Sequence, residues 1–164
     1  MKFSKTDVKL LEELQRDCRQ SLKELSKKLR VPLSTIHGKI RKFEEAKIIR
    51  GYSALLDGEK LGESVTAFVL VQCGTGALEG EQSLKPQDIC RRIARFPFVL
   101  ESHLTTGQYD IFLKLKGKSM RQIGNILMEN IWKIPGVRST QTVEAFYNAK
   151  ETQAIDLSQL AQET

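Results

Sequence analysis

The chain has 164 residues, of which 40% are hydrophobic, a composition typical of a globular protein of one or two compact domains. No apolar run approaches the roughly 20 residues of a membrane span, and the first residues lack the apolar core of a signal peptide, so we expect a cytoplasmic protein with no membrane partner. Cys18, Cys73 and Cys90 form no CxxC pair, which argues against a disulfide framework and a zinc site.

Charge is distributed unevenly along the chain. Residues 1–50 carry fourteen Lys and Arg against seven Asp and Glu, a net of +7, whereas residues 51–164 carry twelve against thirteen, a net of −1. Such segregation suits binding to phosphates, and it predicts that the first third binds DNA with a steep salt dependence. A basic surface also serves solubility, but solubility does not explain why the remaining two thirds are neutral.

The first third of the chain predicts three short helices, over residues 6–14, from residue 22 to a stop at residues 30–32, and over residues 33–46. Thr6 is placed to cap the first helix, and Ser21 with Glu24 has capping-box spacing at the start of the second. Pro32 ends the second helix because proline has no amide hydrogen. Apolar residues at helical spacing predict a shared core of Val8, Leu11, Leu25, Leu29, Ile36, Ile40 and Phe43.

The third predicted helix has a face suited to reading DNA. With about 100° of rotation per residue, its apolar side chains point one way and its polar and basic side chains point the other way. Ser, Thr, His and Arg hydrogen-bond to base edges, whereas Lys mostly contacts phosphates. Any solvated helix has a polar face, but the capped partner helix and the short turn before it favour a helix-turn-helix. The candidate DNA-binding residues are Ser34, Thr35, His37, Gly38, Arg41 and Lys42, with Lys23 from the preceding helix.

The rest of the chain predicts a second domain of the α+β class. Its strands and helices follow the order βαββαβ, at residues 65–73, 86–96, 99–105, 109–116, 119–134 and 138–147, with a polar loop at residues 74–85. This order predicts a ferredoxin-like sheet of four strands with two helices on one face. Because the first strand is apolar on both faces, we expect a second copy of the chain to cover the open face and form a homodimer.

These patterns divide the chain into a helix-turn-helix domain at residues 1–50, an extended connector at 51–62, the βαββαβ domain at 63–149 and a tail at 150–164. Two copies of the third helix related by a two-fold axis would bind a pseudo-palindromic DNA site. In the tail, Ile155, Leu157 and Leu160 suit a short docked helix.

Three separated motifs stand out: LSTIHGKIRKFEEAKIIRGYSALLDGEKLG at residues 33–62, TGQYDIFLKLKG at 106–117 and IPGVRSTQTVEAF at 134–146. In order and spacing they resemble the Lrp/AsnC family of leucine-responsive, feast/famine transcription regulators. The resemblance implies a winged helix-turn-helix domain joined to an effector-sensing domain, and repression or activation of genes, often of amino-acid metabolism. It also implies double-stranded DNA as a partner, homodimers that assemble into tetramers or octamers, and a free amino acid bound between dimers.

The resemblance further places an effector pocket near the glycine-containing hairpin, the C-terminal helix and the last strand. Ordinary structural roles remain open for these residues, since glycine permits turns and threonine is common in strands. Gln108 stands where members often carry an acid, which favours a neutral amino acid over a cationic one, or no effector at all. Carried onto this chain, the pocket comprises Thr106, Gly107, Gln108, Tyr109 and Asp110, then Asn130 with Ile126, and Thr140 and Thr142.

The chain also departs from the family pattern around the third helix. Pro32 stands where members usually carry the Ser that caps this helix, and Arg30 replaces the usual Gly of the turn, so we expect capping from elsewhere. Gly38 replaces a residue that is commonly basic, so the operator preference of relatives does not transfer.

An enzyme is not expected, and neither is a cofactor or metal. His37 and His103 fall in separate predicted domains, and no catalytic or phosphate-binding motif is present. His37 is expected on the exposed reading face and His103 on the sheet, facing the dimer partner. The alternative function is a small-molecule-sensing or assembly module whose N-terminal helices bind a protein instead of DNA; the clustered positive charge favours DNA.

Overall fold

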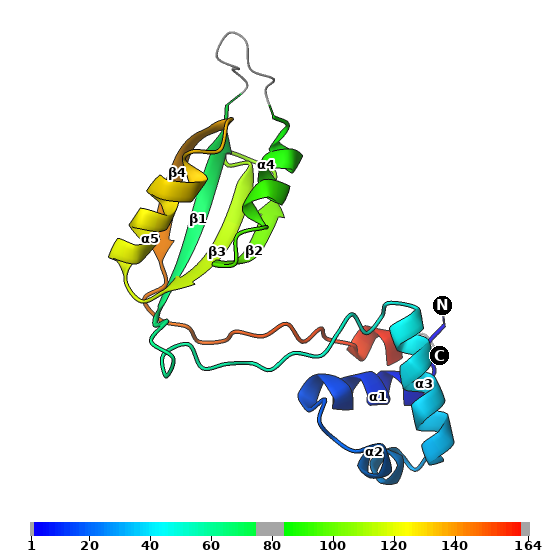
Figure 1. Cartoon of the computed structure of the whole chain (residues 1–164). Helices are drawn as coiled ribbons and strands as arrows, with labels where there is room; N and C mark the ends of the chain where they lie inside the picture. Colours follow the sequence, from blue (N-terminus) through cyan, green and yellow to red (C-terminus); the bar gives the residue numbers. More distant parts are fainter. Residues whose placement is uncertain (1, 75–83, 162–164) are drawn as a thin grey trace. The chain divides into compact units, whose positions relative to one another are not determined.

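The computed structural model describes residues 2–74 and 84–161 (Figure 1). The chain forms two compact units, which are Met1–Leu55 with Lys150–Thr164, here called the N-terminal unit, and Leu56–Ala149, here called the sheet unit. Most of the polar loop expected at residues 74–85 lies outside the described residues.

The N-terminal unit contains α1 (Lys5–Arg16), α2 (Leu22–Leu29) and α3 (Leu33–Glu45), close to the predicted ranges. Ser4, and not Thr6, caps α1: the Ser4 hydroxyl accepts from the Asp7 amide, and the Asp7 carboxylate accepts from the Ser4 amide at 2.8 Å. The prediction for Thr6 was wrong because this reciprocal pair satisfies two free amides and starts the helix at Lys5. The capping box of Ser21 and Glu24 on α2 is confirmed.

One apolar cluster holds the helices of this unit together. Leu29 and Ile40, which were predicted as core residues, are only half-buried, and Leu10, which was not predicted, is fully buried. Val8 is also buried as expected. The buried members of the cluster are Leu10, Leu11, Leu25, Ile36 and Phe43.

The turn between α2 and α3 differs from a standard capped helix start. Arg30 adopts a left-handed conformation with φ 55° and ψ 43°, which costs a residue with a Cβ roughly 1 kcal/mol. The Ser26 hydroxyl holds the turn by donating to the Val31 carbonyl at 2.6 Å. Pro32 occupies the N-cap of α3, and no side-chain cap hydrogen bond is present there among the described residues. The capping that we expected from elsewhere is therefore not supplied by a described side chain.

The sheet unit contains β1 (Val65–Cys73), α4 (Pro86–Ile93), β2 (Val99–Leu104), β3 (Ile111–Gly117), α5 (Met120–Ile126) and β4 (Val137–Glu144). The strands pair antiparallel in the order β2-β3-β1-β4, and α4 and α5 lie on the same face of the sheet (Figure 1). The predicted ferredoxin-like α+β arrangement is confirmed. The last helix was predicted as one element to residue 134, whereas α5 gives way to a π-helical turn, Leu127–Ile131.

The two faces of the sheet differ in their cover. On the helix side, strand residues pack with the helices into a core whose strand members are Ala67, Val69, Val71, Ile111, Leu113 and Leu115. On the open side, Phe68 and Phe112 stack with ring centroids 5.4 Å apart, and Val143 pairs beside Phe68. His103 also lies on this open side, opposite Phe112. Several apolar side chains therefore line the face opposite α4 and α5, which no described helix of the sheet unit covers.

The tail returns to the N-terminal unit. Its described part includes a short 3-10 helix, η2 (Ser158–Ala161), and Leu157 packs against the apolar cluster of α1, α2 and α3. The expected docked helix is therefore present, although the Ile155 side chain is 69% exposed and this residue docks through its backbone.

Candidate nucleic-acid interface and ligand region

The predicted DNA-binding residues lie on exposed surface of the N-terminal unit. All six candidates on α3 are exposed, while Ile36 and Phe43 on the opposite side of the helix are buried. Lys23 of α2 is exposed as well. The packing of α3 therefore leaves its polar face, including His37, open to a partner.

The strongest candidate for base contact is engaged within its own helix. Arg41 donates from Nε to the Glu45 carboxylate at 2.8 Å, and both side chains are mostly exposed. An exposed pair of this kind is worth little in stability, so a nucleic acid can displace Glu45 at small cost.

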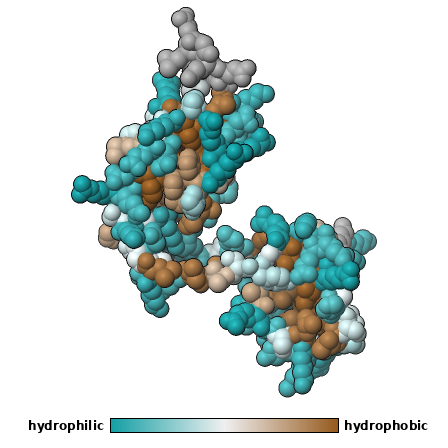
Figure 2. Space-filling model, in the orientation of Figure 1, coloured by the Kyte–Doolittle hydropathy of each residue, from teal (hydrophilic) through white to brown (hydrophobic). Residues whose placement is uncertain are grey.

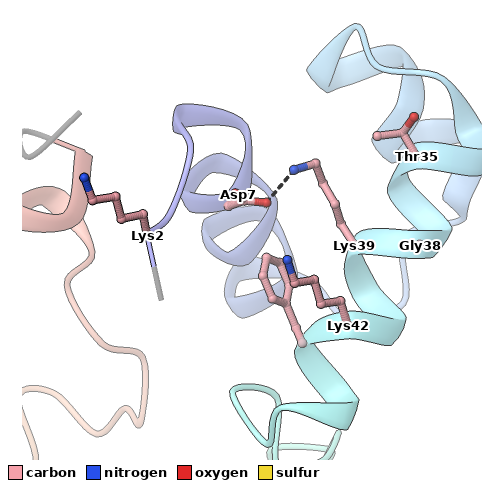
Figure 3. Close-up of a pocket in the computed structure, with 7 residues that line it drawn as sticks. Lys2, Asp7, Thr35, Gly38, Lys39 and Lys42 are labelled. Atoms are coloured by element: carbon pink, nitrogen blue, oxygen red, sulfur yellow. Dashed lines mark hydrogen bonds and ion pairs between the residues drawn. The ribbon is translucent and has the colours of Figure 1, made fainter.

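A hollow of about 390 Å³ lies beside the reading face, between α3 and the start of α1 (Figure 3). Lysines from two segments line it together with a single carboxylate, so the hollow is predominantly basic. Thr35, Gly38 and Lys42, which the sequence predicted as DNA-binding candidates, lie here beside residues that were not predicted for this role. The full lining is Lys2, Asp7, Thr35, Gly38, Lys39, Lys42 and Phe43.

Lys39 is one of the lining residues that the sequence analysis did not name as a DNA-binding candidate. Its Nζ lies 2.6 Å from Oδ1 of Asp7, which links α3 to the capping box of α1 (Figure 3). Partial burial raises the pKa of Asp7, but hydrogen bonds from Lys39 and Ser4 outweigh that effect and hold the pKa below its ordinary value. The pair fixes α3 against α1 and orients an ammonium group beside the reading face.

Gly38 leaves open space at the centre of that face. A Cβ built on this residue would meet nothing within 4 Å. Packing within the described residues therefore does not require glycine here, and a side chain at this position would extend outward from the polar face of α3.

The C-terminal part of α3 is held by the connector. The Tyr52 hydroxyl donates to the Glu44 carboxylate at 2.9 Å. Partial burial, with the negative charge of Glu44, raises the pKa of Tyr52 to about 12, so this donor keeps its proton at any physiological pH.

In the predicted effector region, the hairpin residues divide into exposed and engaged groups. Thr106, Gly107 and Gln108 are exposed, and Gly107 has φ 112°, a conformation that favours glycine. Asp110 is engaged, because its carboxylate accepts from the Cys73 amide at 2.7 Å and ties the hairpin to the end of β1. The polar groups at the tip of the hairpin therefore face solvent.

The strand and helix candidates are also partly committed. Thr140 accepts from Nε1 of Trp132 at 2.8 Å, and the Asn130 side-chain amide donates to the Ile126 carbonyl at 3.1 Å. Thr142 pairs beside Val69 and so lies on the helix side of β4.

Tyr109, by contrast, is directed toward the other face of the sheet. Its hydroxyl donates to Gln141, which pairs beside Leu70 on the open face. Within the described residues of a single chain, the structure thus does not gather all of the effector candidates around one cavity.

Metal, membrane and thiol features add no further site. In the parts of the chain that the structure describes, no group of three or more His, Cys, Asp or Glu residues is arranged to hold a metal, and no helix is long and apolar enough to cross a membrane. Burial raises the pKa of the Cys73 thiol to about 11, and the nearby Asp110 adds to this effect, so the thiol is protonated at neutral pH.

The two units match two known domain families. The profile of the winged helix-turn-helix DNA-binding domain covers residues 3–50, and that of the Lrp/AsnC ligand binding domain covers residues 66–155. The chain belongs to the Lrp/AsnC family. The resemblance drawn from the sequence motifs is confirmed, and the protein is a DNA-binding transcription regulator of the Lrp/AsnC type.

Individual relatives agree with this assignment. An uncharacterized HTH-type transcriptional regulator of Pyrococcus horikoshii is 34% identical over 149 residues, which are 91% of this chain and 96% of the relative. The HTH-type transcriptional regulator FL11 of the same organism is 36% identical over 146 residues, 89% of this chain and 91% of the relative.

Solved structures of transcription regulators share the fold over nearly the whole chain. A transcriptional regulator from Neisseria meningitidis, solved as an L-Met complex, superposes with a TM-score of 0.84 at 25% identity and covers 96% of this chain and 99% of its own. The AsnC protein of E. coli gives a TM-score of 0.80 at 25% identity, covering 94% and 99%.

Proposed function

We propose that α3 of this Lrp/AsnC regulator enters the major groove and reads bases with Ser34, Thr35, His37 and Arg41. The observation that carries this proposal is the exposed polar face of α3 bordered by a basic hollow. Hydroxyl, imidazole and guanidinium groups on such a face can hydrogen-bond to base edges, and Arg is suited to guanine in particular.

In the same proposal, the lysines beside that face contact phosphates. Lys2, Lys39 and Lys42 border the hollow, and Lys23 is exposed on α2. Each phosphate contact releases counterions, so the affinity falls as salt rises. Fluorescence anisotropy with DNA from upstream of the gene tests the assignment: Lys42→Ala should weaken binding to specific and unrelated DNA alike, whereas Arg41→Ala should weaken specific binding more. Equal losses on both DNAs for both variants would contradict the division of roles.

We further propose that two copies pair through the open faces of their sheets. Phe68, Leu70, Phe112 and Val143 give this face an apolar surface, and burying it would be favourable. A two-fold pair would also present two α3 helices to one pseudo-palindromic DNA site. Assembly of such dimers into tetramers or octamers is part of the same proposal.

Sedimentation velocity tests the pairing. Phe112→Asp places a charge in the centre of the open face and should give monomers at micromolar concentration. Glu129→Lys changes an exposed residue of the π-helical turn and serves as a control for the dimer, which it should leave intact. A Phe112→Asp protein that folds and remains dimeric would exclude this face as the dimer interface.

The sheet unit, we propose, binds a neutral amino acid at the hairpin tip, with Thr106, Gly107 and Gln108 contacting the ligand. The candidates Tyr109, Asp110, Asn130, Thr140 and Thr142 would position this region or complete the site between dimers. A carboxylate can accept from exposed backbone amides and a Thr hydroxyl, and the structural neighbour from Neisseria meningitidis was solved with L-Met. Gln108 carries no charge and so gives no electrostatic preference for a cationic side chain.

Thermal-shift screening of the twenty amino acids tests the ligand. A neutral amino acid should raise the melting temperature by mass action, and Gln108→Glu should shift the preference toward lysine or arginine. The absence of stabilisation by any of the twenty would contradict a sensing role for free amino acids.

A further inference from the structure

Ile155, in the C-terminal tail, is paired with the first helix of the N-terminal unit. Nε2 of Gln15 donates to the Ile155 backbone carbonyl at 3.0 Å, and the Ile155 backbone amide donates back to Oε1 of Gln15 at 2.7 Å. One side chain thus satisfies both backbone groups of one residue, as a neighbouring strand would. Because 140 positions separate the two residues, this contact closes a very long loop of chain.

The contact continues into the apolar cluster that positions α3. Leu157, two residues after Ile155, is half-buried and packs against the cluster to which α3 contributes Ile36 and Phe43. Asp156 accepts from the Ser158 amide at 2.9 Å and starts η2, so the backbone around Leu157 is fixed locally. Leu157 of the tail therefore contributes to the packing on the apolar side of α3.

This arrangement gives the chain two covalent links between its units. One runs forward from the N-terminal unit at Leu55 into the sheet unit at Leu56, and the other returns from Ala149 to Lys150. A chain that ended at residue 149 would retain only the first link.

We propose that residues 150–161, here called the C-terminal strap, are a second tether by which the sheet unit controls the packing of α3, with Leu157 as its anchor and Gln15 as its docking partner. Movement at the end of β4 would then be passed to the apolar side of α3 through the strap. Only the step from α3 packing to DNA affinity rests on the proposed DNA-reading function.

Hydrogen exchange on the full-length protein tests the tether without DNA. Leu157→Ala should speed exchange of the α1 and α3 amides by roughly tenfold, since truncating a half-buried Leu removes part of its burial free energy from local stability. Gln15→Ala should have a smaller effect on the same amides. Gln159→Ala, at an exposed position of η2, and Glu12→Ala, at an exposed position of α1, are matched controls and should leave these rates unchanged.

The exchange rates of the α1 and α3 amides decide whether the strap is a tether. Faster exchange in α1 and α3 for Leu157→Ala but not for Gln159→Ala supports the strap, and unchanged exchange overturns it. Wild-type protein can also be diluted below the dissociation constant of its dimer. If the α1 and α3 amides then lose their protection from exchange, the strap docks on a second copy, and the intrachain tether is overturned.

DNA titration of the same variants separates this inference from the proposed function. Leu157→Ala should lower DNA affinity several-fold together with its faster exchange, whereas Arg41→Ala should lower affinity with exchange in α1 and α3 unchanged. If Leu157→Ala speeds exchange while Arg41→Ala has no effect on DNA binding, the tether stands and the reading face is wrong. If Leu157→Ala leaves both exchange and affinity unchanged while Arg41→Ala weakens binding, the reading face stands and the tether is wrong.

Discussion

Arg41 donates a hydrogen bond to Glu45 one turn further along α3, with Nε 2.8 Å from the carboxylate oxygen. The proposed base contact therefore competes with a carboxylate of the same helix, and that carboxylate would also repel DNA phosphates. Because exposed pairs at this spacing are worth only about 0.3 to 0.5 kcal/mol, DNA can break the pair. If Arg41 contacts a base as proposed, the pair should lower DNA affinity without preventing binding.

Glu45→Gln should therefore tighten DNA binding by roughly two- to fivefold at low salt, with a smaller gain at high salt, because it removes both the competitor and the repulsion. Glu12→Gln makes the same charge change at an exposed site on α1 and is the control. Anisotropy titrations of both variants check the effect, and equal gains would assign it to net charge instead of to Arg41.

Replacing Gly38 should change the stability of the N-terminal unit. Gly38→Ala should stabilise the N-terminal unit by about 1 kcal/mol, because alanine is a better helix former and the new Cβ meets nothing within 4 Å. Urea unfolding followed by circular dichroism measures this change. A destabilised Gly38→Ala protein would show that the position is constrained by contacts absent from the structure.

Gly38→Lys extends the same position toward DNA. The new lysine should add about one phosphate contact, so the slope of log affinity against log salt concentration should become steeper by about 1. Gly38→Ala should leave this slope unchanged. Plots of log affinity against log salt concentration for the two variants compare the slopes directly. Identical slopes would place residue 38 away from the DNA backbone.

The protein should be more stable with glycine in place of Arg30. Its φ of 55° costs a residue with a Cβ roughly 1 kcal/mol, so Arg30→Gly should raise the free energy of unfolding by up to about that amount. Lys47, with φ 56°, offers a matched site at the end of α3, and Lys47→Gly should act similarly. A loss of stability in Arg30→Gly alone would show that the Arg30 side chain makes a stabilising contact.

The lowered pKa of the Asp7 carboxyl group predicts that the stability of the protein depends on pH. The pKa of Asp7 is lower in the folded chain than in the unfolded chain, so its contribution is fully present above about pH 4 and is lost as the pH falls through the folded pKa. Asp7→Asn should cost about 1 kcal/mol at pH 7 and progressively less below pH 4. Urea titrations at several pH values measure the difference, with Glu12→Gln as the control. A cost that stays constant down to pH 2 would contradict this assignment.

Local signals explain what could be predicted from the sequence of the N-terminal unit. Ser21 and Glu24 mark α2 because a capping box is decided within four residues. Ser4 and Asp7 carry a similar signal, and the prediction of Thr6 overlooked it. The Lys39 pair with Asp7 could not be predicted in this way, because it depends on how α1 and α3 cross.

In the sheet unit, the order of strand-like and helix-like segments along the chain predicted a four-stranded sheet with helices on one face only. The same pattern could not predict that Asp110 binds the end of β1, because that contact depends on strand register. The strap shows the same limit, since Gln15 and Ile155 carry no common motif.

Figure 2 shows mixed polar and apolar side chains along the segments that join the units. In these segments Leu55, Leu56, Phe146 and Tyr147 are strongly exposed.

The most direct test of the central claim is an anisotropy titration of DNA from upstream of the gene, at several salt concentrations, with wild-type protein and Arg41→Ala. The proposed reading face predicts binding that weakens steeply as salt rises, and a loss of about tenfold or more on Arg41→Ala. Binding that is absent at low salt, or that is equally tight for wild type and Arg41→Ala, would contradict DNA reading by α3.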